Sequence, residues 1–144
     1  MYHSLYYPGA QPFDTPLSIG VGDILKRPKG LFMHQGVCIG VDWLDVRVLH
    51  VTPGQGILLS SYAEFADGKT VTVAKKAQRS EIPAIIARAQ TELEQPSAYD
   101  PLTNNCEHLV NRVVLGVSKS VTVELLIAII IALVVIAGFV ALSA

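Results

Sequence analysis

The chain has 144 residues, a formal charge of -1, 51% hydrophobic side chains and a mean hydropathy of +0.43. A near-neutral chain without a basic run is not typical of nucleic-acid binding, so we expect no nucleic-acid partner. Two cysteines do not make a disulfide framework, and the high hydropathy comes mainly from the C-terminal end of the chain.

The first segment, residues 1–20, lacks the basic start and the continuous apolar stretch of a secretory signal. Its tyrosines and prolines predict an irregular N-terminal arm that lies either on the domain or against a membrane surface. Residues 21–118 follow as one domain, which is long enough to bury a modest core.

The domain opens with a strand-like pattern. A strand over residues 23–27 is expected to end at Pro28. Residues 34–41 then alternate in character, which places His34 and Cys38 on the same face of a second strand. His34 therefore projects from near the beginning of that strand.

The pattern continues as an antiparallel sheet. Residues 46–51 form a return strand that carries His50, and a hairpin of this kind can bring the two histidines together. A short strand over 57–59, a helical turn over 62–65 and a strand over 70–74 complete the sheet portion.

The period changes after Ser80, where apolar residues recur at the spacing of one helical face. Ser80 is the expected cap of this helix, and Pro83 is tolerated in its first turn. A second helix over residues 106–115 ends before Gly116. The fold class predicted from these elements is α+β, an antiparallel sheet packed against helices.

The last segment predicts a membrane anchor. Residues 125–144 contain no charged side chain, and as a helix these twenty residues would reach roughly 30 Å, the thickness of a bilayer core. A buried core helix is the alternative, but it would have to be apolar on every face. We expect a single-pass anchor over residues 121–144, with the domain on the cytoplasmic side because Arg112 and Lys119 precede the span.

The motif Asn105-Cys106-Glu107-His108 stands at the start of the second helix. A thiol is a strong nucleophile only as a thiolate, and the N–H groups and dipole of a helix N-terminus lower its pKa. Asn104 or Asn105 would cap this helix. We therefore predict that Cys106 is a nucleophile and that His34 is its base.

A metal site is the main competing chemistry for a chain with cysteines and histidines. The sequence contains no Cys-x-x-Cys pair, and Cys38 is better explained as buried packing within an apolar strand. We expect no metal and no cofactor.

Several of these residues together resemble the lecithin:retinol acyltransferase family, which includes the small phospholipase A/acyltransferases. The resemblance covers about residues 20–118 and also the layout of the C-terminal anchor. It is carried by Gly22-Asp23-Ile24, by His34, by Leu49-His50-Val51-Thr52-Pro53, by Tyr99 and by the run from Asn104 to Val110.

The resemblance implies a circularly permuted papain-like fold, related to the NlpC-type peptidases, in which the histidine precedes the cysteine. The family pattern makes Cys106 the nucleophile, His34 the base and His50 the orienting third residue. Gln35 and Gly36 depart from this pattern, because the lipid-acting vertebrate members tend to have a tryptophan after the first histidine.

The required chemistry is acyl transfer through a thioester. Cys106 would attack an acyl carbonyl, and backbone N–H groups at the helix start, including its own, would hold the oxyanion. The leading hypothesis is a membrane-anchored thiol acyltransferase or phospholipase that takes an acyl group from a membrane phospholipid and passes it to water, an amine or an alcohol. A cysteine peptidase or amidase, and a non-enzymatic membrane adaptor, are the alternatives. The acyl acceptor and the oligomeric state stay open.

Overall fold

The computed structural model describes residues 18–42 and 45–143. In this part of the chain the strands are β1 (Ile24–Lys29), β2 (Phe32–Val41), β3 (Val46–Thr52), β4 (Gly56–Ser61) and β5 (Thr72–Lys75). The helices are α1 (Tyr62–Ala66), α2 (Ile82–Glu94), α3 (Cys106–Leu115) and α4 (Val121–Ser143). The strands form one antiparallel sheet in the order β4-β3-β2-β1-β5, which confirms the predicted α+β class.

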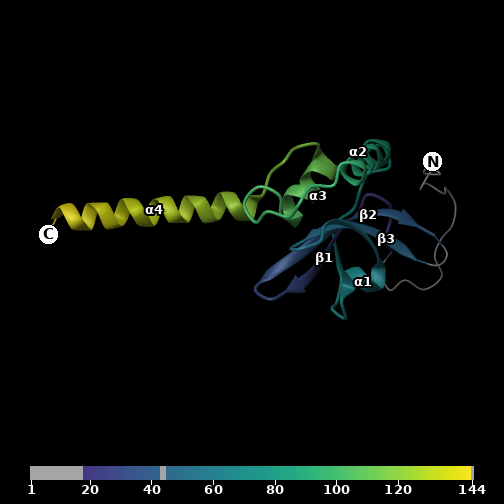
Figure 1. Ribbon diagram of the computed structural model, residues 1–144, viewed down its shortest axis with the longest axis horizontal. Helices are drawn as coiled ribbons and strands as arrows, with labels where there is room; N and C mark the ends of the chain where they lie inside the picture. Colours follow the sequence, from purple (N-terminus) through teal and green to yellow (C-terminus); the bar gives the residue numbers. More distant parts are fainter. Residues whose placement is uncertain (1–17, 43–44, 144) are drawn as a thin grey trace.

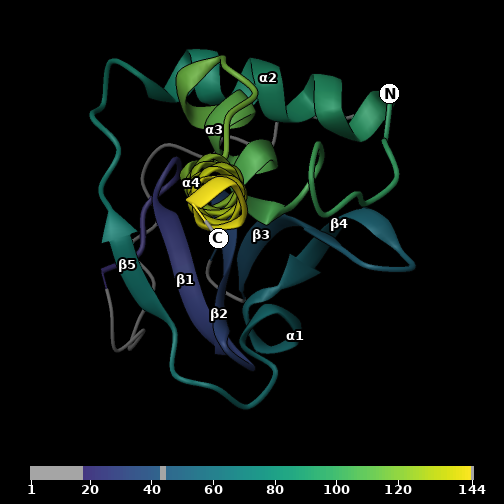
Figure 2. The same cartoon turned by 90° about the vertical axis from the view of Figure 1, so that its left-hand side faces the viewer.

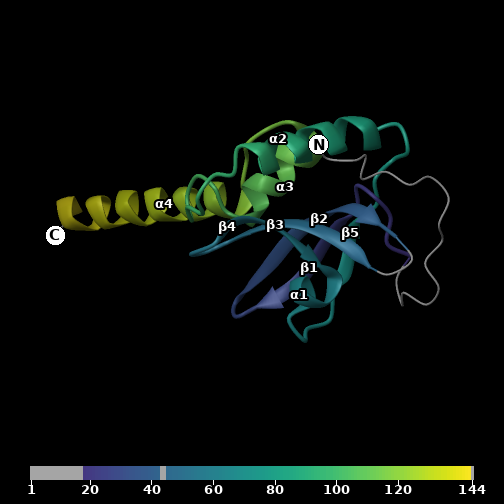
Figure 3. The same ribbon diagram turned by 45° about the vertical axis from the view of Figure 1, so that its right-hand side comes forward.

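The helices lie on both sides of this sheet and beyond it. Helices α2 and α3 cover one face, α1 lies on the other, and α4 projects away from the domain (Figure 1, Figure 3). When α4 points toward the viewer, the strands fan out below α2 and α3 (Figure 2). The predicted N-terminal arm, residues 1–20, falls outside the described residues except for its last three.

The sheet separates two apolar clusters because neighbouring residues of a strand point to opposite faces. Val37 and Leu49 belong to the cluster beneath α2 and α3. Cys38 and Val48 belong to the cluster on the other face, around the fully buried Phe65 of α1. His34 and His50 have the parity of this second group, so their side chains lie on the Phe65 side of the sheet.

Several boundaries differ from the sequence-based expectation. Strand β1 continues through Pro28 because β5 pairs only with its first part, from Ile24 to Lys26, and the missing N–H of a proline is tolerated on an open edge. Strand β4 extends to Ser61, two residues beyond the predicted end, and pairs with β3 along its whole length.

The predicted cap of α2 was wrong. Glu81 occupies the N-cap position with helical dihedral angles and no side-chain cap, and Pro83 lies in the first turn as expected. A proline there has no N–H that needs a cap, which reduces the benefit of a serine at this position.

Asp23 has a larger structural role than the turn residue that its sequence context suggested. Its buried carboxylate accepts hydrogen bonds from the backbone N–H groups of Gly20 (2.8 Å) and Ala77 (3.0 Å) and forms an ion pair with Lys76 (2.7 Å). These bonds tie the beginning of β1 to the segment between β5 and α2, so that α2 is held over the sheet.

Beyond its first turn, helix α4 is apolar on all sides, and none of its residues is buried against the rest of the described chain. It is long and apolar enough to span a membrane, as predicted. Arg112, one of the two basic residues used to orient the span, is instead paired with Glu92 in the domain, through bonds of 2.7 and 3.0 Å. The basic flank of the span therefore depends on Lys119, which is half-exposed and lies 3.7 Å from Glu124.

The contact between the sheet and α1 predicts a cost for any side chain at Gly36. A Cβ there would lie 2.6 Å from Val48 Cγ1 and 2.9 Å from Phe65 Cε2. We expect Gly36→Ala to lower the free energy of unfolding by about 1–3 kcal/mol, measured by urea unfolding of the full chain in detergent micelles. Gly138→Ala, where a Cβ meets nothing within 4 Å, is the control; equal stability of both variants would contradict the packing described.

Candidate active site

The start of α3 is fixed by its cap. The Asn105 side-chain oxygen accepts hydrogen bonds from the backbone N–H groups of Glu107 (2.9 Å) and His108 (3.1 Å), while His108 Nδ1 accepts one from the Asn105 N–H (3.4 Å). This capping box resolves the choice between the two asparagines and places Cys106 at the first helical position. His108 is buried as part of the cap, not on the helix surface.

Asn104 has a different task. Its side chain donates to Ser97 Oγ (2.9 Å) and to the Ala98 carbonyl, and accepts from Arg112 (2.8 Å). The two adjacent asparagines therefore have different roles: Asn105 caps α3, and Asn104 holds the preceding loop against this helix.

The thiol of Cys106 is half-buried and lies against the backbone of β2. Its Sγ donates to the Met33 carbonyl at 3.9 Å, and the N–H of Gln35 is directed at the sulfur. These two peptide groups lie on either side of His34. The structure therefore places the thiol beside the backbone of the predicted base, as the position of α3 over the sheet requires.

The two histidines form a direct hydrogen bond. His34 Nε2 and His50 Nδ1 are 2.9 Å apart, and the rings meet edge to face with centroids 5.1 Å apart. Both rings also contact Phe65, at centroid distances of 5.5 and 5.3 Å. One nitrogen of the pair must donate and the other accept, so the bond couples the tautomers of the two rings.

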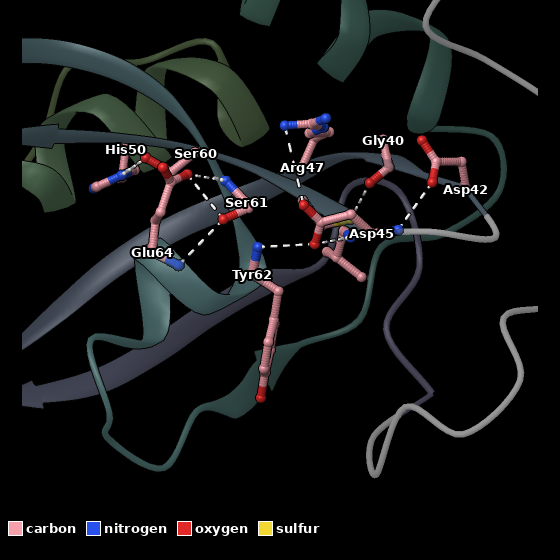
Figure 4. A network of polar contacts seen from close by, with 11 residues as sticks. Gly40, Asp42, Asp45, Arg47, His50, Ser60, Ser61, Tyr62 and Glu64 are labelled. Carbon is pink, nitrogen blue, oxygen red and sulfur yellow. Dashed lines mark hydrogen bonds and ion pairs between the residues drawn. The ribbon is translucent and has the colours of Figure 1, made fainter.

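The hydrogen-bonded chain continues to a residue that the sequence did not indicate. His50 Nε2 lies 2.9 Å from Ser60 Oγ, at the end of β4 (Figure 4). The next residue, Ser61, caps α1 through a reciprocal pair of bonds with Glu64, which holds the β4–α1 junction in place. The predicted strand stopped at Leu59; extending β4 in register with β3 would have placed Ser60 beside His50.

No hydrogen bond joins Cys106 to His34 within the described residues. The Nε2 atom of His34 is hydrogen-bonded to His50. Among the described residues, the only fully buried side-chain nitrogen or oxygen without a hydrogen-bond partner is Arg27 Nε, so His34 Nδ1 is not a fully buried atom without a partner. His34 Nδ1 is therefore unpaired but reachable. Cys106 packs with the apolar cluster beneath α2 and α3, whereas the His34 ring contacts Phe65 on the other face of the sheet, so the thiol meets the backbone beside His34 and not its ring.

Both histidines are held neutral. Burial, followed by the charges of His50 and Arg27, lowers the pKa of His34 to about 3, and burial with Arg27 lowers the pKa of His50 to about 4. Arg27 is itself buried, with its guanidinium 5.9 Å from the centre of the Phe65 ring. At neutral pH each ring therefore keeps one nitrogen unprotonated, and protonation costs more than in water.

The expected lowering of the Cys106 pKa was wrong. Burial raises the pKa of this thiol, and the neighbouring carboxylate of Glu107 raises it further, against the lowering effect of the N–H groups of Gln35, Cys106 and Glu107. The cap uses the N–H groups of Glu107 and His108, so fewer helix-terminal donors reach the sulfur than the sequence suggested. The resting site is a neutral thiol beside a neutral imidazole.

The remaining chemical side chains have simpler roles. Cys38 is fully buried, and burial raises the pKa of its thiol to about 12, in agreement with a packing role. Tyr99 lines an open hollow of about 530 Å³ with Ile57 and Pro96. Burial, and then the charge of Cys106, raises the pKa of this tyrosine, but Cys106 itself does not line the hollow. In the described ranges no three His, Cys, Asp or Glu side chains gather as metal ligands.

Helix α4 begins next to the first turn of α3. Ser120 caps α4 by accepting from the Val123 N–H (3.2 Å), and its hydroxyl donates to Glu107 Oε2 (2.7 Å). The same carboxylate oxygen accepts from the Thr122 N–H at 3.2 Å. Glu107 therefore joins the first turn of α3 to the first turn of α4.

Fold and site together define an α+β protein with a capped cysteine beside a histidine pair and an apolar C-terminal helix. The family model described as Lecithin retinol acyltransferase matches residues 18–119, and the chain belongs to this family. Membership supports an acyltransferase or phospholipase type of activity. No curated protein matches the chain.

The electrostatics predict how Cys106 reacts. Because the thiolate is the reactive form and the thiol pKa is raised, alkylation of Cys106 by iodoacetamide should accelerate with pH through pH 9. Glu107→Gln removes a charge that opposes ionisation, so its rate profile should move to lower pH. Peptide mass spectrometry separates Cys106 from Cys38. The exposed helix residue Glu94, changed to Gln, is the control; a plateau below pH 8, or identical profiles for both variants, would contradict these directions.

Proposed function

We propose that the protein is a membrane-anchored thiol acyltransferase of the phospholipase A type. It takes an acyl group from a phospholipid ester onto Cys106 and passes it to water, an amine or an alcohol. The single observation that carries this proposal is the placement of the Cys106 sulfur against the backbone on both sides of His34, whose ring is oriented by His50.

The first step is proton removal. For His34 to act through Nδ1, its proton must be on Nε2 and donated to His50 Nδ1; His50 then carries its own proton on Nε2 and donates it to Ser60. This arrangement leaves the Nδ1 lone pair of His34 unoccupied, and a movement that brings the thiol to this nitrogen is part of the proposal. Since both groups rest neutral, proton transfer accompanies attack on the carbonyl instead of preceding it.

The second element is the oxyanion site. In the cap of α3 the N–H groups of Glu107 and His108 are occupied by Asn105, while the N–H of Cys106 stays outside the cap and points toward its own sulfur. We assign this N–H to the oxyanion that forms as sulfur adds to the carbonyl carbon. One such donor contributes about 3 kcal/mol to barrier lowering.

Collapse of the tetrahedral intermediate completes the transfer. The carbon–oxygen bond of the ester breaks, the imidazolium returns its proton to the leaving alkoxide, and an acyl thioester stays on Cys106. An acceptor O–H or N–H then adds to the thioester, its proton passes to His34, and the thiolate leaves and is reprotonated. Anchoring by α4 keeps these steps at the surface where lipid esters are concentrated. The cytoplasmic orientation of the domain is part of the proposal and depends on Lys119.

The test is formation of a thioester on the full chain in micelles containing a defined phosphatidylcholine. We expect intact-mass detection of one acyl adduct that neutral hydroxylamine removes, together with released fatty acid. Cys106→Ala should abolish both, and His34→Gln should slow fatty-acid release about 10²–10⁴-fold.

Cys38→Ala is the matched control, since it removes the other thiol, and it should keep both the adduct and the turnover. Unchanged lipid turnover in Cys106→Ala would refute the proposal. Cleavage of peptides without consumption of lipid would replace it with a cysteine peptidase or amidase.

A further inference from the structure

The turn between β1 and β2 is unusually apolar for its position. Lys29 pairs with Phe32, so Gly30 and Leu31 form a two-residue turn, with Gly30 at φ 60° in its first position. A two-residue turn of this kind is rigid and directs the side chains at its tip away from the domain.

The tip exposes large apolar side chains. Leu31 is 97% exposed, Phe32 70% and Met33 45%. Turns in water are normally polar, and contiguous exposed apolar residues mark a contact surface. Lys29, at the base of the tip, is also exposed, so the apolar end has a cationic neighbour.

The tip lies at the membrane end of the molecule. In Figure 1 the β1–β2 turn lies below the start of α4, at a similar position along the long axis, whereas α2 lies toward the opposite end, and Figure 3 shows the same arrangement. Contacts connect the two features: Met33 touches Cys106, and the neighbouring Glu107 holds Ser120 at the start of α4. If α4 crosses a bilayer, the tip faces that bilayer.

We infer that this β1–β2 tip, residues Lys29 to Met33, inserts into the lipid surface beside the anchor. The bilayer is the occupant because the tip lies at the same end of the molecule as α4, which is itself uncovered and apolar. Leu31 and Phe32 enter the boundary between headgroups and acyl chains, roughly 5–10 Å deep, and Lys29 stays at the level of the lipid phosphates.

Insertion would also set the height of the thiol. Leu31 is two residues beyond Met33, roughly 7 Å along the strand, and the Met33 carbonyl touches Cys106 Sγ. A tip at the acyl boundary therefore holds the sulfur close to the depth of the lipid ester groups. This last step rests on the proposed function; the insertion itself does not.

Tryptophan depth measurement on the full chain in phosphatidylcholine vesicles tests the insertion. Phe32→Trp places a reporter at the tip, and Gln90→Trp places one on the exposed side of α2. The unmodified chain, whose single tryptophan is Trp43, supplies the baseline to subtract. We expect lipids brominated near the ester end of the acyl chain to quench Phe32→Trp at least about twofold more than Gln90→Trp, and acrylamide to quench Gln90→Trp more.

Equal quenching of the two reporters by brominated lipid would overturn the inference. The same measurement in a Cys106→Ala background separates it from the proposed function, because quenching needs no turnover. Lipid quenching at position 32 in that variant supports insertion whether or not the chain transfers acyl groups.

Discussion

The hydrogen bond between His34 and His50 is the interaction on which the candidate site depends. Val37 pairs with Leu49, and the same register places Gly36 opposite His50. Because Gly36 has no side chain, the His34 side chain can reach His50 diagonally across it. The space left by that glycine is filled by the Phe65 ring. The sheet and α1 thereby fix the two imidazole rings in one relative orientation.

Burial determines the protonation states of His34 and Cys106. Desolvation and the charge of Arg27 keep His34 neutral, and desolvation together with Glu107 keeps Cys106 a thiol. A neutral pair differs from the standing thiolate–imidazolium pair of many cysteine enzymes. Under the proposed function a neutral pair would suit a lipid surface, where separated charges are costly and a permanently ionised thiol would be exposed to oxidation.

The sequence predicted those features that a local pattern determines. The bounds of α3, its asparagine cap and the apolar α4 follow from composition and periodicity, and the His34–His50 hairpin follows from alternation. Ser60 was missed because strand ends depend on pairing with a neighbour, which periodicity does not report. The raised pKa of Cys106 was missed because it is a balance between helix N–H groups and burial, and burial is known only once β2 and α3 are packed together.

Hydrogen bonds of Glu107 connect the apolar helix α4 to the helix that carries the candidate nucleophile, Cys106. The Cys106 sulfur in turn lies against the backbone next to His34. The proposed role of His34 as the base depends on which of its ring nitrogens carries the proton. ¹⁵N NMR of the imidazole at neutral pH in micelles measures this directly. We expect a proton on Nε2 and a bare Nδ1; a proton on Nδ1, or a doubly protonated ring, would contradict the proposed role of His34.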